Sequence, residues 1–128
     1  MNTKRVTPYR ITRLEEGQVF VFGSNGAGMH GGGAAYIALE QFGAIMGQAE
    51  GLQGNSYAIN TMDGLQVFEE QAKRFIAFAK EHRDLTFLLT PVGCGIAGYT
   101  PHEVAGFFKG AVDVENIWMP NSFWEELI

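Results

Sequence analysis

Glycine is concentrated in three short stretches of this 128-residue chain. Six of its seventeen glycines fall within 23–33, four within 43–54 and three within 93–98. Glycine adopts backbone conformations, and allows close approaches, that a side chain would obstruct. The glycines follow no G-X-Y period, which excludes a collagen-like chain. The clusters therefore predict segments whose function depends on the backbone itself rather than on side chains.

The segments between these clusters alternate between strand and helix patterns. Short apolar, β-favouring runs predict buried strands at 18–22, 56–61, 85–90 and 116–119. A weaker strand is expected at 5–12, where Pro8 favours a sheet edge. Helices are expected at 34–42, at 65–82 and from 101 onward, with a helical turn at 123–127. The segment 43–54 is expected to be an irregular loop.

The third of these helices has a complete start signal. Thr100 is suited to the N-cap, Pro101 to the first helical position, and Glu103 completes the spacing of a capping box. Alternating strands and helices with buried-type strands predict an α/β fold, with a mixed, mostly parallel sheet of about five strands flanked by helices. Because there is no internal repeat or linker, residues 1–128 are expected to form a single domain.

Charge and composition exclude several functional classes. The formal net charge of −5 argues against non-specific nucleic-acid binding, which needs a basic surface. Sixteen aromatic residues argue against disorder. The single cysteine, Cys94, cannot form an intramolecular disulfide, and neither a secretory signal nor a membrane-length apolar stretch is present. We therefore expect a soluble, cytoplasmic protein without a membrane partner, and no residue spacing suggests a metal site or a cofactor.

Two glycine clusters match the pattern G-x-G-x-x-G, at 26–31 and at 93–98, each between a predicted strand and a predicted helix. Glycine lets backbone amides approach phosphate oxygens, and a helix N-terminus adds partial positive charge. Tight turns without a ligand are the alternative. In an open α/β sheet both loops would lie beyond the carboxyl ends of the strands, where ligands bind.

A dinucleotide-binding Rossmann motif does not account for either loop. It needs an acidic residue about 20 positions on, at the end of the next strand. Glu50 follows the first loop without a preceding strand, and Glu115 precedes its strand rather than ending it. No Gly-Lys-Ser/Thr occurs, so a Walker loop is absent as well.

The two loops resemble those of the macrodomain family. Gly23-Ser-Asn25, followed after five residues by Gly31-Gly-Gly33-Ala-Ala, resembles the first ligand loop of that family. Gly93-Cys-Gly95-Ile-Ala-Gly98-Tyr99 resembles its second loop, which wraps a pyrophosphate. The resemblance covers most of the chain and is closer still to a compact group from phage and bacterial genomes. It implies a three-layer macro-like fold and a protein of a bacterial or phage-infected cell.

The resemblance also implies a ligand and a set of binding residues. The ligand would be ADP-ribose or a relative derived from NAD, free or attached to a macromolecule. Asn25 would hydrogen-bond the distal ribose, which Gly31, Gly32 and Gly33 would line. The second loop would cradle the diphosphate, with Tyr99 along the ribose; its residues are Gly93, Cys94, Gly95, Ile96, Ala97, Gly98 and Tyr99.

Three positions depart from the family pattern. Arg10 replaces the aspartate that hydrogen-bonds adenine, a task that Glu15 or Glu16 could take over. Ala35 and Ala97 stand where two hydrolase branches carry their catalytic aspartates, and alanine cannot activate water. The leading hypothesis is therefore a protein that reads or sequesters an ADP-ribose-type ligand without covalent chemistry.

Two other functions remain open. An ADP-ribosyl hydrolase would need His30 or Glu50 in place of the missing aspartates, although His30 could equally be a solvent-facing loop residue. Cys94 could be a nucleophile or a small space-filling residue. Gln48, Glu50 and Gln53 could line the pocket or belong to an ordinary connection, and Asn60-Thr61 could close it. The third function is an interaction module whose C-terminal tail, with Trp124, docks on the domain or forms a subunit contact.

Overall fold

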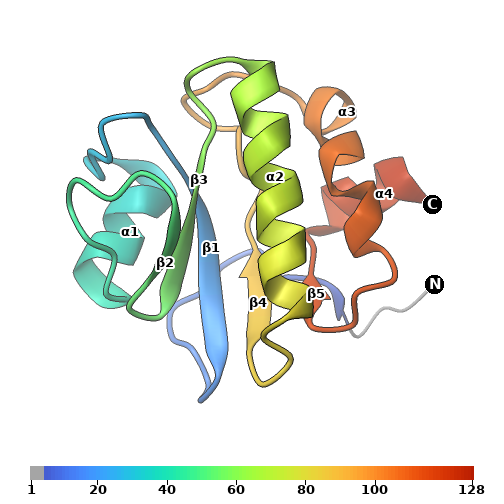
Figure 1. The fold of residues 1–128 in the computed structure, drawn as a ribbon, viewed down its shortest axis with the longest axis horizontal. Coiled ribbons are helices and arrows are strands. Elements are labelled where there is room, and N and C mark those ends of the chain that lie inside the picture. Colours follow the sequence, from blue (N-terminus) through green and yellow to red (C-terminus); the bar gives the residue numbers. More distant parts are fainter. Residues whose placement is uncertain (1–4) are drawn as a thin grey trace.

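A computed structural model describes residues 5–128, which form one five-stranded sheet flanked by helices (Figure 1). The strands are β1 (Gln18–Ser24), β2 (Gly51–Gln53), β3 (Ser56–Asn60), β4 (Thr86–Leu89) and β5 (Ile117–Trp118). The helices are α1 (Gly33–Gln41), α2 (Leu65–Lys80), α3 (Pro101–Val104), the 3-10 helix η2 (Ala105–Ala111) and α4 (Asn121–Leu127). The predicted α/β class is confirmed.

The sheet is mixed and mostly parallel, with the strand order β2-β3-β1-β4-β5. β1 occupies the centre and pairs in parallel with β3 and β4, so that Val21 lies beside Tyr57 on one side and Leu89 on the other. β4 pairs in parallel with β5, whereas β2 is an antiparallel edge strand. The carboxyl ends of β1, β3 and β4 therefore meet at one edge of the sheet.

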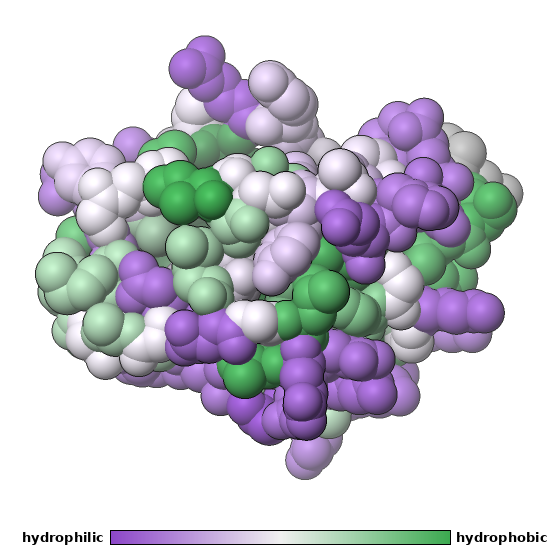
Figure 2. Space-filling view, turned by 90° about the horizontal axis from the view of Figure 1, so that it is seen from above, coloured by the Kyte–Doolittle hydropathy of each residue, from purple (hydrophilic) through white to green (hydrophobic). Residues whose placement is uncertain are grey.

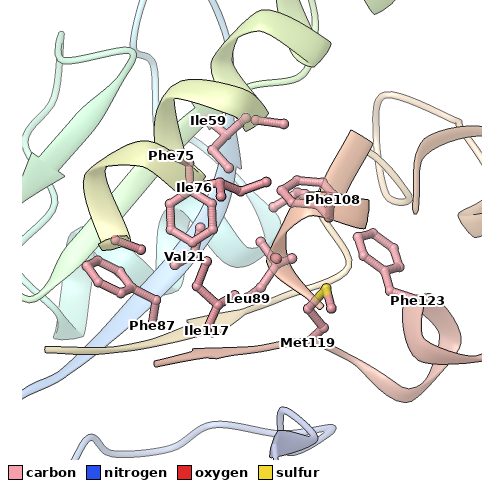
Figure 3. Packing of buried hydrophobic residues seen from close by; sticks show 14 of the residues in the cluster. Val21, Ile59, Phe75, Ile76, Phe87, Leu89, Phe108, Ile117, Met119 and Phe123 are labelled. Atoms are coloured by element: carbon pink, nitrogen blue, oxygen red, sulfur yellow. The ribbon is translucent and has the colours of Figure 1, made fainter. Parts of the chain in front are cut away.

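Alternating side chains of β1 point into two separate hydrophobic clusters. Val19 and Val21 belong to the larger cluster, which is covered by α2, η2 and α4. Figure 3 shows this cluster, where Phe75 and Phe108 pack over Val21 and Leu89. Phe20 and Phe22 belong to the smaller cluster on the opposite face, beneath α1. Because both faces are covered, β1 is apolar without alternation, as a central parallel strand should be.

The predicted helix start at Thr100 is confirmed in detail. The Thr100 hydroxyl accepts a hydrogen bond from the Glu103 amide, and the Glu103 carboxylate accepts one from the Thr100 amide at 2.9 Å. α3 is only four residues long and continues directly as η2. The capping box thus fixes the point at which the chain leaves the second glycine loop.

The prediction of a strand at 5–12 is wrong. Only Val6 forms a single parallel bridge, with Met119, and the hydrogen bonds of this segment stop at Thr7. Pro8 follows immediately and has no N–H to continue the ladder. Residues 8–12 instead run along the surface.

The segment 43–54 is more ordered than predicted, because it contains β2. A two-residue turn at Gly54-Asn55 returns the chain, so that Gln53 lies opposite Ser56. A Gly-Asn pair between short extended runs is a hairpin signal that could have located this strand.

The C-terminal segment docks on the domain, one of the two outcomes expected for it. Phe123 is fully buried and Trp124 nearly so. Trp124 Nε1 donates a hydrogen bond to the Arg5 carbonyl at 2.9 Å. Within residues 5–128, none of the helices combines the length and apolar character needed to cross a membrane.

Candidate ligand-binding cleft

A cleft of about 530 Å³ lies beyond the carboxyl ends of β1, β3 and β4. It is formed by the loops that follow these three strands. Its walls consist of Gly23, Ser24, Asn25, Met29, Gly31, Gly32, Gly33, Ala34, Ala35, Thr61, Met62, Thr90, Pro91, Val92, Gly93, Cys94, Gly95, Ile96 and Ala97. Figure 2 looks onto this edge, where apolar and near-neutral surface lies over much of the loops.

The first glycine loop rests on the second glycine cluster. Gly28 has φ of +67°, and a Cβ there would lie 2.4 Å from the carbonyl carbon of Gly47. The Gly47 amide donates a hydrogen bond to the Gly28 carbonyl at 2.8 Å. No side chain could occupy this contact, so the glycines of 43–54 support the loop of 23–33.

Asn25 braces the first loop from within. Its side-chain amide donates to the Met29 carbonyl at 3.0 Å, and its carbonyl oxygen accepts from the Met29 amide at 2.9 Å. An Asn side chain has two donor hydrogens and two acceptor lone pairs, so one of each remains for a ligand. Asn25 lines the cleft, where the predicted ribose contact requires it.

Several backbone amides in both loops have no acceptor among the described residues. Six of them belong to Gly31, Gly32 and Gly33 in the first loop and to Gly95, Ile96 and Ala97 in the second. All six residues line the cleft. The first three lead into α1, whose N-terminus is not capped by any described side chain. Amides of this kind and a helix N-terminus together favour an anion.

The second loop is closed by its own backbone and anchored to the core. The Tyr99 amide donates to the Gly93 carbonyl at 2.9 Å, which joins the two ends of the loop. Gly93 has φ of +80°, and a Cβ there would lie 2.5 Å from Cε2 of Phe68. At the tip of the loop, exposed Ile96 reaches across toward Gly32, with Cδ1 4.0 Å from where a Gly32 Cβ would be.

Nine of the eleven predicted binding residues line the cleft, and Gly98 and Tyr99 do not. The half-buried Tyr99 ring packs near Phe68, with ring centroids 6.2 Å apart. It faces the core because Gly93 allows the loop to lie directly on Phe68. The expectation that Tyr99 lies along a ribose is therefore not supported by its position.

His30 is not a solvent-facing residue; it is fully buried beneath the first loop. Its ring contacts the face of Phe22 in a T-shaped arrangement, with centroids 5.1 Å apart, and Nε2 lies 3.2 Å from Oε1 of Gln53. It does not line the cleft. The contact with Gln53, which is itself buried at the base of the loop, holds the His30 ring in this position.

Glu50 is also outside the cleft. Both of its carboxylate oxygens accept hydrogen bonds from Arg74 of α2, at 2.8 and 3.0 Å. This hydrogen bond with Glu50 raises the pKa of the Arg74 guanidinium. The pair ties the segment before β2 to α2, so Glu50 is committed to a structural contact rather than to a cleft-facing role.

Gln48 and Gln53 are structural as well. Gln53 is almost fully buried and donates to the carbonyls of Gln48 and Gly51, while its carbonyl oxygen accepts from the Ile45 amide at 2.7 Å. Gln48 donates to the carbonyls of Glu50 and Leu52. The two side chains replace the backbone hydrogen bonds that an irregular segment lacks. The alternative in which they line a pocket is wrong.

Cys94 and Thr61 line the cleft. Burial, and secondarily the charge of Glu103, raises the pKa of the Cys94 thiol, and the thiol donates to the Val92 carbonyl at 3.7 Å. This environment disfavours the thiolate that a nucleophile requires.

Asn60 does not line the cleft, because its side chain forms hydrogen bonds with the Met62 amide and Asp63. The cleft is also lined by residues that were not predicted from the sequence, among them Met29, Met62, Thr90 and Pro91.

A second, larger hollow of about 1360 Å³ adjoins the first and was not predicted. The two share Gly33, Ala34, Thr90 and Pro91. Its remaining walls come from Val6, Thr7, Pro8, Tyr9, Arg10, Ile11, Thr12, Phe20, Ile37, Gln41, Pro120, Asn121 and Ser122. The two hollows adjoin at the shared residues and are together called the groove; the second is lined by α1 as far as Gln41.

The two hollows differ in charge from the rest of the chain. The described residues that line the first hollow include no Asp, Glu, Lys, Arg or His, and those of the second include only Arg10. Ala35 and Ala97 both lie in the first hollow. Comparison of the chain with protein-family models, curated proteins and solved structures found no match.

Proposed function

We propose that this protein binds ADP-ribose or a related NAD-derived nucleotide in the groove formed by the two adjoining hollows, and that it reads or sequesters this ligand without covalent chemistry. One observation carries the proposal: six unpaired amides from two glycine loops line a cleft without a carboxylate among its described lining residues. Such amides suit the oxygens of a diphosphate. The resemblance of both loops to macrodomain ligand loops supports the same class of ligand.

The shape of the groove supports a ligand with two ends joined by a diphosphate. The first hollow carries Asn25 and the amides, and the second offers apolar walls from Phe20, Ile11 and Ile37. A ribose and a diphosphate are polar, whereas a nucleobase has apolar faces. In this proposal the diphosphate lies between the two glycine loops, and the nucleoside extends into the second hollow.

Recognition is favoured over hydrolysis by the placement of the ionisable groups. His30 is buried below the first loop, and Glu50 is paired with Arg74. Neither lines the groove, and alanine occupies positions 35 and 97. A general acid or base must come within about 3 Å of the proton that it transfers, directly or through one water.

The proposal is tested by calorimetry with ADP-ribose, AMP and NAD on the wild-type chain and on Gly95→Leu. A Cβ at Gly95 would have no neighbour within 4 Å, and Gly95 has no positive φ, so a leucine fits the fold but enters the cleft. We expect Gly95→Leu to weaken ADP-ribose binding at least tenfold, or about 1.4 kcal/mol.

Gly106→Leu is the matched control, because Gly106 is exposed on η2 with equal space around it and lies outside both hollows. It should bind as the wild type does. Absence of heat with all three ligands at millimolar concentration would reject the proposal. Unchanged affinity in Gly95→Leu would show that the diphosphate does not lie on the second loop.

A further inference from the structure

Arg10 is the only charged residue among the described residues that line either hollow. The chain as a whole carries fourteen acidic and nine basic residues, so a groove without acidic side chains stands out from the rest of its surface. Arg10 is exposed, and its guanidinium forms no hydrogen bond or ion pair with another described residue. Its donors are therefore available to a ligand in the second hollow.

Arg10 is the one cationic side chain in the described walls of the second hollow. Pro8, Pro91 and Pro120 have no N–H, and much of the remaining wall is aliphatic or aromatic. Neutral polar side chains also line the hollow and can donate hydrogen bonds; they include Tyr9, Thr12, Gln41, Asn121 and Ser122. The first hollow meets an anion with backbone amides, whereas the second shares the Gly33 amide with it and adds side-chain donors, of which only Arg10 carries charge.

We propose that Arg10 binds a phosphate monoester at the nucleoside end of the ligand, so that the preferred ligand is ADP-ribose with a 2′-phosphate, of the class derived from NADP. This inference rests on the proposed function. The guanidinium has five donors and no acceptor, and it pairs with phosphate oxygens in a bidentate manner. An arginine near the ribose is also how dinucleotide-binding sites accommodate a 2′-phosphate.

The charge of the groove favours a phosphate over a neutral acceptor. Arg10 cannot accept a hydrogen bond from the amino group of adenine, so its partner must present acceptors. The paired acceptors of a 6-oxopurine edge would satisfy it too. A neutral base, however, does not explain why acidic side chains are absent from the described walls of both hollows. A ligand with a diphosphate and a further phosphate explains this absence, because each carboxylate would repel such a ligand.

The experiment compares 2′-phospho-ADP-ribose with ADP-ribose by calorimetry on the wild type, Arg10→Gln and Arg10→Lys. We expect the wild type to bind the phosphorylated ligand at least tenfold more tightly, and we expect added salt to reduce this preference. Arg10→Gln should remove the preference, so that the two ligands bind to this variant within about twofold of each other. Arg10→Lys should retain part of it, since it keeps the charge but loses the bidentate geometry.

Arg13→Gln is the control for charge. Arg13 is exposed, lies three residues from Arg10, pairs with Glu15 at 3.3 Å and does not line the hollow. It should leave the preference intact. Equal binding of the two ligands by the wild type, a preference that survives Arg10→Gln, or tighter binding of GDP-ribose than of both would overturn the inference. Failure of both adenine ligands to bind would instead reject the proposed function.

Discussion

Two glycines of the second loop, only two positions apart, are required for different reasons. Gly93 has φ of +80° and lies so close to Phe68 that a Cβ would be 2.5 Å from the ring. Gly95 has neither a positive φ nor a neighbour within 4 Å. Gly93 therefore serves the fold, whereas in our proposal Gly95 serves the ligand by leaving the cleft open.

We expect Gly93→Ala to lower the free energy of unfolding by about 1–3 kcal/mol, because it combines backbone strain with a clash against a buried ring. Gly95→Ala should change it by less than about 0.5 kcal/mol. Urea unfolding of both variants measures the difference. A similar loss in the two variants would contradict the distinct roles assigned to these glycines.

Single residues show both the strength and the limit of inference from the sequence. Nine of the eleven binding residues that the resemblance implied line the cleft, because both loops follow parallel strands whose carboxyl ends meet at one edge of the sheet. His30 and Glu50 were misplaced, because their surroundings depend on Gln53 and Arg74, which lie 23 and 24 positions further along the chain. A sequence pattern gives the chemistry of such a side chain, but not which neighbours it meets.

Among the elements, β3 carries Tyr57, an ionisable side chain whose perturbed pKa has a measurable consequence. Tyr57 is buried among Phe75 and Phe78, with ring centroids 5.1 and 5.2 Å away. Burial raises the pKa of the Tyr57 hydroxyl from 10.0 to about 12, with a smaller contribution from Glu50 and an opposing one from Arg74. The folded state therefore disfavours the phenolate.

This pKa shift predicts alkaline sensitivity. Below pH 10 Tyr57 is neutral in both the folded and the unfolded state, and the stabilisation that results from the pKa difference is complete. As the pH rises from about 10 to about 12, Tyr57 loses its proton first in the unfolded chain, so this stabilisation is lost. Tyr57→Phe should show a shallower fall in urea midpoint over this range. Tyr9→Phe, at a fully exposed position, is the control; equal slopes for wild type and Tyr57→Phe would refute the assignment.

Elements with a clear periodic pattern or start signal were predictable, whereas β2 was not predicted. α2 repeats its apolar residues over sixteen positions, and the capping box marks the start of α3, so both were located from the sequence. β2 has three residues, one of them the exposed Leu52, so its own residues show no clear pattern and the Gly54-Asn55 turn is the signal that indicates it. β2 is held in place by its pairing with β3 and by the buried Gln53 side chain.

At the scale of the whole molecule, Arg5 joins the first described residues to the last third of the chain. Its guanidinium donates to the carbonyls of Ala111, Val112, Val114 and Ile117, at 2.7–3.1 Å. It also lies over the Trp124 ring, 5.1 Å from the centroid. Burial lowers the pKa of Arg5, opposed by the charges of Glu115 and Asp113. One side chain thus secures the end of η2, β5 and α4 together.

We expect Arg5→Met to lower the free energy of unfolding by about 2–4 kcal/mol, because it leaves several buried carbonyls without donors. Arg5→Lys should lose nearly as much, since an ammonium cannot reach carbonyls in the fork geometry of a guanidinium. Urea unfolding provides the measurement, with the exposed Arg13→Met as the control. A loss below about 0.5 kcal/mol would mean that water replaces these hydrogen bonds without cost.

The fold class and the first hollow follow from local patterns, whereas the second hollow does not. Alternating strand and helix periods and two glycine motifs are each contained in a short window. The second hollow brings residues 6–12 against α1 and residues 120–122, which are far apart in the chain and share no motif. Only tertiary contacts, such as the bridge between Val6 and Met119, create it.

The neck where the two hollows meet gives the groove a thermodynamic property that neither hollow has alone. Gly33, Ala34, Thr90 and Pro91 belong to both walls, so the ligand of our proposal, which fills both hollows, crosses at this point. Once one end is held, the other is confined near its own hollow at a high effective concentration. In our proposal two weak half-sites therefore act as one strong one, and we expect the protein to discriminate by the length of the connector as much as by the chemistry of either end.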